Sequence, residues 1–361
     1  MATYKEEFPL VLAKTKKDGQ VNKFNLADPE ERKLYFNEKV GEEITKLREY
    51  FENHTFVAYW LGKKNAGKGT YSKLMMEIFG NDKIAHISVG DVVRDTHKAL
   101  ETAAGREELA AYLKKDYRGY ISIEEGIKAI LNRSQDKVSV PNELMLSLVK
   151  REIDKQAGKI IFIDGFPRTL DQISYSLYFR ALINYREDPD IFITIDIPVS
   201  VIDERMKYRV VCPKCQTPRN LKLFATREVG YDRGKEKFYL ICDNPDCQNE
   251  RMGAKEGDNL GIESIRARLE MDQQLIDRVF SLHGVPKILL RNSIPVAEAK
   301  NLVDDYEITP EYVYELEDDQ KVKIIEKPWV IKDDEGHDAY SLLAPPVVVS
   351  LIKQLAKILL G

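Results

Sequence analysis

The stretch Leu61–Leu74 has the sequence LGKKNAGKGTYSKL, and it decides how the surrounding chain folds. From Gly62 to Lys68 it matches the pattern G-x-x-x-x-G-K, with Gly69 where serine or threonine is usual and Thr70 one residue later. An apolar run at 55–62 precedes the pattern, and a run with helical periodicity follows it. A strand, a glycine-rich loop and a helix in this order favour a loop whose backbone N–H groups bind phosphate.

The composition of this loop suits a nucleoside triphosphate. Lys68 can reach the β- and γ-phosphates, and Asn65 can replace a glycine because asparagine adopts positive φ more readily than most residues. The alternative is a glycine-rich turn that binds nothing. We expect phosphate contacts from Gly62, Ala66, Gly67, Lys68, Gly69 and Thr70.

Further apolar runs predict the rest of the core. The runs IAHIS, KIIFID and DIFITID are each followed by helical periodicity, as TFVAYWLG is. Strands that alternate with helices predict an α/β fold, in which a mostly parallel P-loop sheet is flanked by helices. Ligands of such sheets bind at the carboxyl ends of the strands, where the distinctive residues of this chain lie.

Two insertions and two extensions surround this core. Residues 91–157 are predicted to form a helical insertion, and residues 210–257 a small β-rich insertion that holds all four cysteines. The core is therefore expected at 55–90, 158–209 and 258–361, the last part including a C-terminal extension. Within the core we expect a helix over 259–283, a hairpin within 322–343 and a final helix over 347–360.

The N-terminal extension, residues 1–54, is expected to be helical. Asp28 can cap a helix over 29–53, Pro29 suits its first turn, and Glu31 stands where a capping box needs a carboxylate. The apolar stripe of this helix indicates packing on its own domain, with a partner-binding arm as the alternative.

Composition bounds the class of protein. The 361 residues include 43% hydrophobic residues, enough for a sizeable core, and the formal charge of −4 gives no overall field that attracts a polyanion. No apolar run reaches 18 residues, and the acidic start of the chain is unlike a secretory signal. We therefore expect a cytoplasmic monomer that contacts no membrane.

The cysteines have the spacing of a metal site. Cys212 and Cys215 form C-x₂-C, and Cys242 and Cys247 form C-x₄-C after a 26-residue gap. Two close pairs suit one tetrahedral zinc, and four thiolates leave no open position, so the metal is expected to be structural. Four unligated thiols are the alternative.

Several motifs together resemble one known family. GKGT, HISVGDVVRD at 86–95, DGFPRTLDQ at 164–172, DIPVSVIDERMKYR at 196–209 and ESIRARLE at 263–270 occur in this order. The combination resembles the adenylate kinase family of nucleoside monophosphate kinases, and the resemblance covers about residues 55–272. It implies magnesium-dependent transfer of a phosphoryl group from ATP to AMP, giving two ADP. The cysteine segment resembles the zinc-bearing lid of that family.

The resemblance also implies roles for individual residues. The catalytic cations would be Lys68, Arg168, Arg205, Arg209 and Arg268. The AMP site would contain Val89, Arg94, Val140, Gly165, Arg168 and Gln172. Asp91 and Asp164 would orient magnesium-bound water, although Asp91 could instead simply cap the helix that follows it.

Departures from the family pattern keep other functions open. Val89 replaces a usual threonine, the second cysteine pair is wider than usual, and the lid arginine is missing, with Arg251 or Lys255 as its replacement. Residues 1–54 and those after Pro286 have no counterpart. One alternative is a kinase of the same fold for another monophosphate. The other is a non-catalytic ATP sensor whose cysteine ribbon binds RNA or protein, although we do not expect nucleic acid as a partner.

Overall fold

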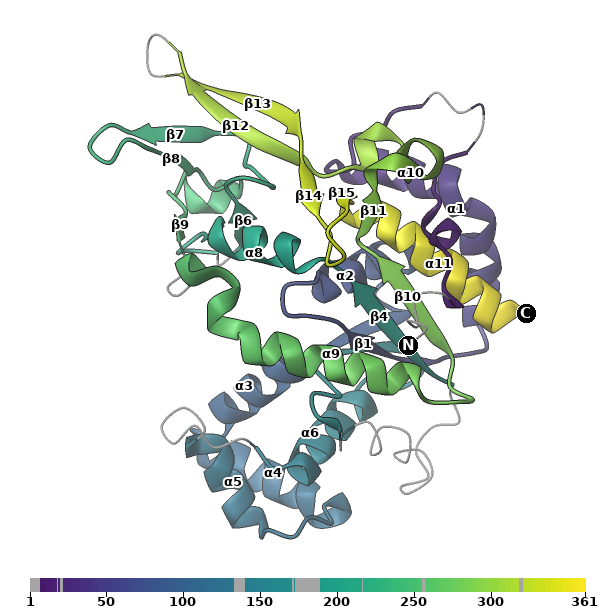
Figure 1. Cartoon of the computed structure of the whole chain (residues 1–361). Coiled ribbons are helices and arrows are strands. Elements are labelled where there is room, and N and C mark those ends of the chain that lie inside the picture. The colour runs from purple at the N-terminus through teal and green to yellow at the C-terminus, as the bar shows by residue number, and fades with distance from the viewer. Residues whose placement is uncertain are drawn as a thin grey trace.

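The centre of the molecule is a five-stranded sheet. The computed structural model describes residues 7–17, 19, 22–132, 140–170, 172, 189–215, 217–254, 258–317 and 321–361 (Figure 1). All neighbouring strands of the sheet are parallel. Their order is β10 (Lys287–Arg291), β4 (Asp190–Asp196), β1 (Val57–Leu61), β3 (Ile160–Asp164) and β2 (Ile84–Ser88). The predicted α/β class and its four strands are confirmed, and β10 is an additional strand.

The burial of strand β1 shows that helices cover both faces of the sheet. All five of its residues are buried. Ala58 and Trp60 pack with α1 (Pro29–Phe51), α2 (Lys68–Phe79) and α11 (Ala344–Leu360), whereas Val57, Tyr59 and Leu61 pack with helices on the other face. The alternation follows from the two-residue period of a strand. Among the described helices, none combines the length and apolar character that a membrane span requires.

The helices that follow β2 belong to one apolar cluster with the second face of the sheet. These are α3 (Val89–Ala99), α4 (Ala103–Asp116), α5 (Ile123–Asn132) and α6 (Asn142–Asp154), so the described part of 91–157 is helical as expected. The predicted helix over 259–283 begins as a 3-10 helix, η4 (Asp258–Ile265), and becomes α9 (Arg266–Phe280). Gly261, with φ 56°, kinks η4, which is why a single helix does not form.

The start of α1 differs from the prediction in one detail. Asp28 accepts hydrogen bonds from the N–H groups of Glu30 (2.9 Å) and Glu31 (3.0 Å), so the predicted cap is present. The carboxylate of Glu31, however, accepts from the N–H of Asn25 at 2.7 Å instead of from Asp28. The chain before the helix folds back toward its first turn, and only half of the capping box forms.

The cysteine segment is built from short antiparallel strands. After α8 (Val199–Lys207), β5 (Arg209–Val211) pairs with β6 (Pro218–Asn220) and β9 (Gly253–Ala254), and β7 (Val229–Asp232) pairs with β8 (Lys237–Leu240). The 3-10 helix η3 (Pro245–Cys247) carries the last cysteine.

The C-terminal extension forms two hairpins. Strand β12 (Pro310–Leu316) pairs with β13 (Val322–Pro328), and β14 (Val330–Lys332) pairs with β15 (Asp338–Ser341), which also pairs with β11 (Ser293–Pro295). The predicted single hairpin over 322–343 is therefore wrong in its first half, because β13 pairs with the preceding strand. The short helices η2 (Leu10–Ala13), α10 (Val296–Leu302) and η5 (Asp305–Glu307) complete the described elements.

The β12–β13 hairpin contacts the cysteine segment. Figure 1 shows it beside β7 and β8. The ring centroids of Tyr314 and Phe238 lie 5.5 Å apart, and the N–H of Tyr312 donates to the carbonyl of Lys222 at 2.7 Å. Tyr314 also packs against the cluster that contains three of the cysteines. A segment too small for a core of its own thus gains apolar contact from a distant part of the chain.

A buried carboxylate joins the N-terminal extension to the C-terminal extension. Glu307 is fully buried and accepts hydrogen bonds from the hydroxyls of Tyr35 and Thr15 (2.5 Å) and from the N–H of Asp304 (2.7 Å). Lys39, also buried, pairs with Asp304 at 2.7 Å. Burial raises the pKa of Glu307 above its ordinary value of 4.5, although its hydrogen bonds oppose the shift.

This raised pKa predicts a pH dependence of stability. The native state binds the Glu307 proton more tightly than the unfolded chain, so the free energy of unfolding should fall as pH rises above the ordinary value of 4.5 and through the raised pKa of the folded state. In Glu307→Gln the amide can accept from Thr15 and donate to Tyr35, so this part of the dependence should disappear. Urea unfolding at several pH values measures it. The control is Glu49→Gln, at an exposed position of α1, and an unchanged slope in Glu307→Gln would contradict the assignment.

Candidate active site

The loop between β1 and α2 has the backbone that the motif predicts. Gly62 (φ 146°), Asn65 (φ 66°) and Gly67 (φ 103°) all have positive φ. A Cβ at Gly62 would lie 3.3 Å from Cβ of Ile195, so a side chain there would also crowd β4. Asn65 replaces a glycine as expected. The loop turns sharply and ends at Lys68, the first residue of α2.

Lys68 bridges the loop to the end of β3. Its Nζ donates to the carbonyls of Gly62 (2.9 Å) and Lys63 (3.3 Å) and lies 3.8 Å from Oδ1 of Asp164. Burial lowers the pKa of Lys68, and the carboxylates of Asp164 and Asp272 oppose that shift. The ammonium group is thus held within the loop, beside the carboxyl end of the sheet.

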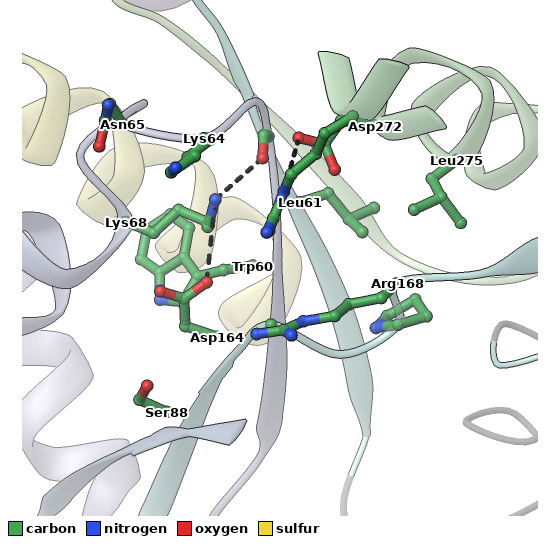
Figure 2. A pocket seen from close by; sticks show the side chains of 14 residues that line it. Trp60, Leu61, Lys64, Asn65, Lys68, Ser88, Asp164, Arg168, Asp272 and Leu275 are labelled. Atoms are coloured by element: carbon green, nitrogen blue, oxygen red, sulfur yellow. Dashed lines mark hydrogen bonds and ion pairs between the residues drawn. The ribbon is translucent and has the colours of Figure 1, made fainter. Parts of the chain in front are cut away.

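A pocket opens at this point between β1, β3 and α9 (Figure 2). Arg168 enters it from the segment after β3, and Arg268 and Asp272 enter it from α9. Of the predicted site residues, the pocket is lined by Gly62, Lys68, Asp164, Gly165, Arg168 and Arg268. The structure therefore brings residues from three separate motifs to one place.

Two glycines leave room for the Arg168 side chain. A Cβ at Gly165 would lie 2.7 Å from Nη2 of Arg168, and one at Gly90 would lie 3.7 Å from it. Burial lowers the pKa of Arg168, as does the neighbouring charge of Arg268. A guanidinium group held here has donors available for an anion.

Arg205 and Arg209 contact the phosphate loop from outside this pocket. Arg205 donates to the Asn65 carbonyl at 3.1 Å and to Oδ1 of Asn292 at 3.3 Å. Arg209 donates to Oδ1 of Asn65 at 3.3 Å and makes a bidentate pair with Asp258 at 2.5 and 2.7 Å. Burial lowers the pKa of Arg205. Both arginines, which precede the cysteine segment in the sequence, thus meet at one loop residue.

The predicted acceptor residues are less closely gathered. Arg94 forms an ion pair with Asp91 on α3, and both side chains are more than half exposed and outside the pocket at Lys68. Asp91 is not the cap of α3, because Ser88 accepts from the Asp91 N–H. Val89 is buried and Val140 is half-buried.

Gln172 has partners within the protein. It is 6% exposed, accepts from the N–H of Arg168 at 2.6 Å and donates to Oδ1 of Asn142 at 2.7 Å. Its side chain therefore fixes the turn that carries Arg168 and links this turn to the start of α6. Residue 171 and residues 173–188 lie outside the described residues.

Two residues of the site were not predicted. Asp272 lines the pocket, and its position four residues after Arg268 on a helix is a signal that could have identified it. Asn292 is fully buried and binds Arg205, Tyr71 and Ser341. Asn292 directly follows β10 and is far from the phosphate loop in the sequence. No local pattern therefore indicates that the two are in contact.

The four cysteines form one cluster. All four Sγ atoms lie within 4.8 Å of one another, with 3.8 Å between Cys212 and Cys247 and 3.6 Å between Cys215 and Cys242. A tetrahedral ion with metal–sulfur bonds of about 2.3 Å separates its sulfurs by about 3.8 Å. The cluster is therefore compatible with zinc. Arg251 pairs with Asp232 at 2.8 Å, and Lys255 lies outside the described residues.

Comparison with known proteins identifies adenylate kinases and a UMP-CMP kinase among the relatives of this chain. An adenylate kinase of Kosmotoga olearia is 32% identical over 226 residues, which are 62% of this chain and 86% of that enzyme. The adenylate kinase of Thermotoga petrophila is 32% identical over 163 residues, 45% of this chain and 62% of the enzyme, and so is matched over less than two thirds of its length. A probable UMP-CMP kinase 2 of Arabidopsis thaliana is 27% identical over 197 residues, 53% of this chain and 64% of that protein. No family model matches the sequence.

The left-handed backbone of Asn65 predicts an order of stability among variants. Asn65→Ala keeps the Cβ at positive φ but removes the polar group that helps asparagine adopt this conformation, and it should lower the free energy of unfolding by about 1 kcal/mol. Asn65→Gly should lower it less, because glycine adopts this conformation freely. Urea unfolding compares them. A glycine variant less stable than the alanine variant would contradict the loop geometry.

Proposed function

The chain belongs to the adenylate kinase family of nucleoside monophosphate kinases, and from this premise we propose that it transfers the γ-phosphoryl group of ATP to AMP. The reaction is reversible and gives two ADP. Support comes from the 86% coverage of the Kosmotoga olearia adenylate kinase and from the residues that meet at the phosphate loop.

The observation that carries the proposal is that Lys68 and Arg168 line one pocket (Figure 2). Lys68 belongs to the loop that would hold the donor triphosphate, and Arg168 belongs to the DGFPRT segment that would hold the acceptor phosphate. Phosphoryl transfer needs alignment of donor and acceptor and positive charge around the transferred group, and little covalent help. A pocket lined by both cations supports this reaction.

The other predicted catalytic arginines already lie near the loop, and closure of the two insertions would add Arg94 to them. Arg205 and Arg209 already contact Asn65, and Arg268 stands at the pocket wall. We propose that residues 210–257 move as a lid and 91–157 as an acceptor domain, which would bring Arg94 toward the acceptor phosphate. Closure would exclude water, so that transfer outcompetes hydrolysis.

Magnesium would bind beside Asp164. This carboxylate lies at the carboxyl end of β3, a quarter exposed and 3.8 Å from Nζ of Lys68, where it can hold water of a hydrated cation. When bound, magnesium would neutralise charge on the β- and γ-phosphate oxygens. Asp91 would contribute only after release from its ion pair with Arg94.

The choice of monophosphate rests mainly on Gln172. Its amide would recognise adenine, but it also binds Arg168 and Asn142, so recognition requires an exchange of hydrogen bonds. The similarity to a probable UMP-CMP kinase supports a pyrimidine monophosphate as the second candidate acceptor. Turnover of different monophosphates separates these candidates.

We expect one structural zinc per chain in the four-cysteine cluster. Elemental analysis of the purified protein should find about one zinc, because four thiolates complete a tetrahedral shell. Chelation should accelerate hydrogen exchange within residues 210–257, which would lose their central cross-link, and should leave α1 unchanged. Equal exchange in 210–257 before and after loss of the metal would contradict a structural role.

Phosphorus NMR tests the activity. The protein is mixed with magnesium and ATP and, in separate samples, with AMP, GMP, CMP or UMP. Reversible formation of ADP with AMP alone is the expected result. Transfer to another monophosphate would retain the reaction class and contradict the role of Gln172. Absence of transfer to all four, together with salt-dependent binding of RNA, would favour the non-catalytic alternative.

Replacement of Arg168 in the same assay tests its proposed role as a catalytic cation. Arg168→Ala should reduce turnover by at least about 10³-fold, the magnitude expected for a cation on the transferred phosphate. The matched control is Arg266→Ala, which removes an exposed arginine of α9 and should leave turnover unchanged. If Arg168→Ala kept a tenth of the normal activity, Arg168 would not be one of the cations that contact the transferred phosphate.

A further inference from the structure

Asp272 is an acidic side chain inside a pocket that otherwise suits anions. It extends from α9 toward the loop, opposite Lys68 (Figure 2), and it lies near Arg268. The side chain is 14% exposed. A carboxylate at this depth loses much of its hydration, which costs free energy unless partners replace the water.

The partners of Asp272 replace that water incompletely. The carboxylate accepts a hydrogen bond from the backbone N–H of Lys64, in the phosphate loop, and its Oδ2 lies 3.9 Å from Nε of Arg268. Oδ2 is buried and has no hydrogen-bond partner among the residues that the structure describes. Burial raises the pKa of Asp272, although Arg268, Lys68 and Arg168 oppose the shift.

Asp272 occupies interactions that a phosphate would use. The N–H of Lys64 and the guanidinium of Arg268 are donors suited to a phosphoryl oxygen as much as to a carboxylate. The ion pair with Arg268 is a weak reason to bury an acid, because Arg268 is 45% exposed and such pairs contribute little to stability. A role toward the bound phosphate therefore explains the buried carboxylate of Asp272 better than a contribution to the stability of α9 does.

We propose that Asp272 makes this pocket select the magnesium complex of a triphosphate over the free polyanion. The inference rests on the proposed phosphate site and adds a residue that determines its specificity. A free triphosphate carries about twice the net negative charge of its magnesium complex, so a fixed carboxylate repels it about twice as strongly. A divalent cation near the phosphates would also stabilise the carboxylate oxygen that lacks a hydrogen bond.

The test uses inorganic tripolyphosphate, which has no base or sugar and probes the pocket alone. Isothermal titration calorimetry on the full chain measures its affinity with EDTA and with excess magnesium. Asp272→Asn keeps the shape and removes the charge, and it should bind free tripolyphosphate at least about tenfold more tightly. Its affinity for the magnesium complex should change less than about threefold, because the smaller net charge reduces the repulsion that is removed.

Glu270→Gln is the matched control. It makes the same change of charge on the same helix at an exposed position and should leave both affinities unchanged. Thermal unfolding of each variant confirms that the proteins compared are folded. Tightening in Glu270→Gln equal to that in Asp272→Asn would contradict the proposal, because a general effect of charge would then explain both.

Two other outcomes would overturn the proposal. Free tripolyphosphate bound no more tightly by Asp272→Asn than by the unaltered chain would show that the carboxylate does not oppose the anion. If Asp272→Asn weakened binding of the magnesium complex and left binding of the free anion unchanged, Asp272 would be a metal ligand instead. The kinase proposal can fail independently of this one. It would fail if the unaltered chain bound the magnesium complex of tripolyphosphate in preference to the free anion and yet transferred no phosphoryl group.

Discussion

The turn from β1 into α2 is the constraint on which the rest of the site depends. Its three residues with positive φ allow the backbone to reverse within a few residues and to place Lys68 at the start of α2. The same turn offers the Asn65 carbonyl to Arg205 and the Asn65 side chain to Arg209. One short loop thereby fixes Lys68, the cation proposed for the donor phosphates, and the two arginines that precede the cysteine segment.

The C-terminal extension supports this loop from a second side. Asp334, in the turn between β14 and β15, pairs with Lys63 at 2.8 Å and accepts from the N–H of Val199 at 2.7 Å. Ser341 donates to Oδ1 of Asn292, the atom that also accepts from Arg205. Because β12 and β13 contact the cysteine segment as well, the extension links the segment proposed as a lid to the phosphate loop.

The charges of the site follow from where the strands end. Asp164 lies at the end of β3, and Arg168 follows it after a glycine that leaves space for the guanidinium. These residues meet Lys68 because parallel strands place their carboxyl ends at one edge of the sheet. Asp272 and Arg268 complete the pocket from α9, so both cations and carboxylates line the position proposed for the phosphates.

Local sequence predicted the parts of this site that have local causes. The positive φ of Asn65, the capped helix α1 and the buried strands each follow from residue type or periodicity, and the structure agrees. Pairing between distant segments has no such signal, which explains why β13 was assigned to the wrong hairpin and why Asn292 was missed. Asp272 was missed because its one signal, the four-residue spacing from Arg268, is shared by many ordinary helix pairs.

The central claim is that donor and acceptor phosphates meet between Lys68 and Arg168 in one continuous site. Binding of a molecule with two adenosines joined by five phosphates tests it most directly, since only adjacent sites can hold both ends at once. The account predicts one such molecule per chain, bound at least about a hundredfold more tightly than ATP and displacing both ATP and AMP. Affinity equal to that of ATP, with AMP still bound, would contradict it.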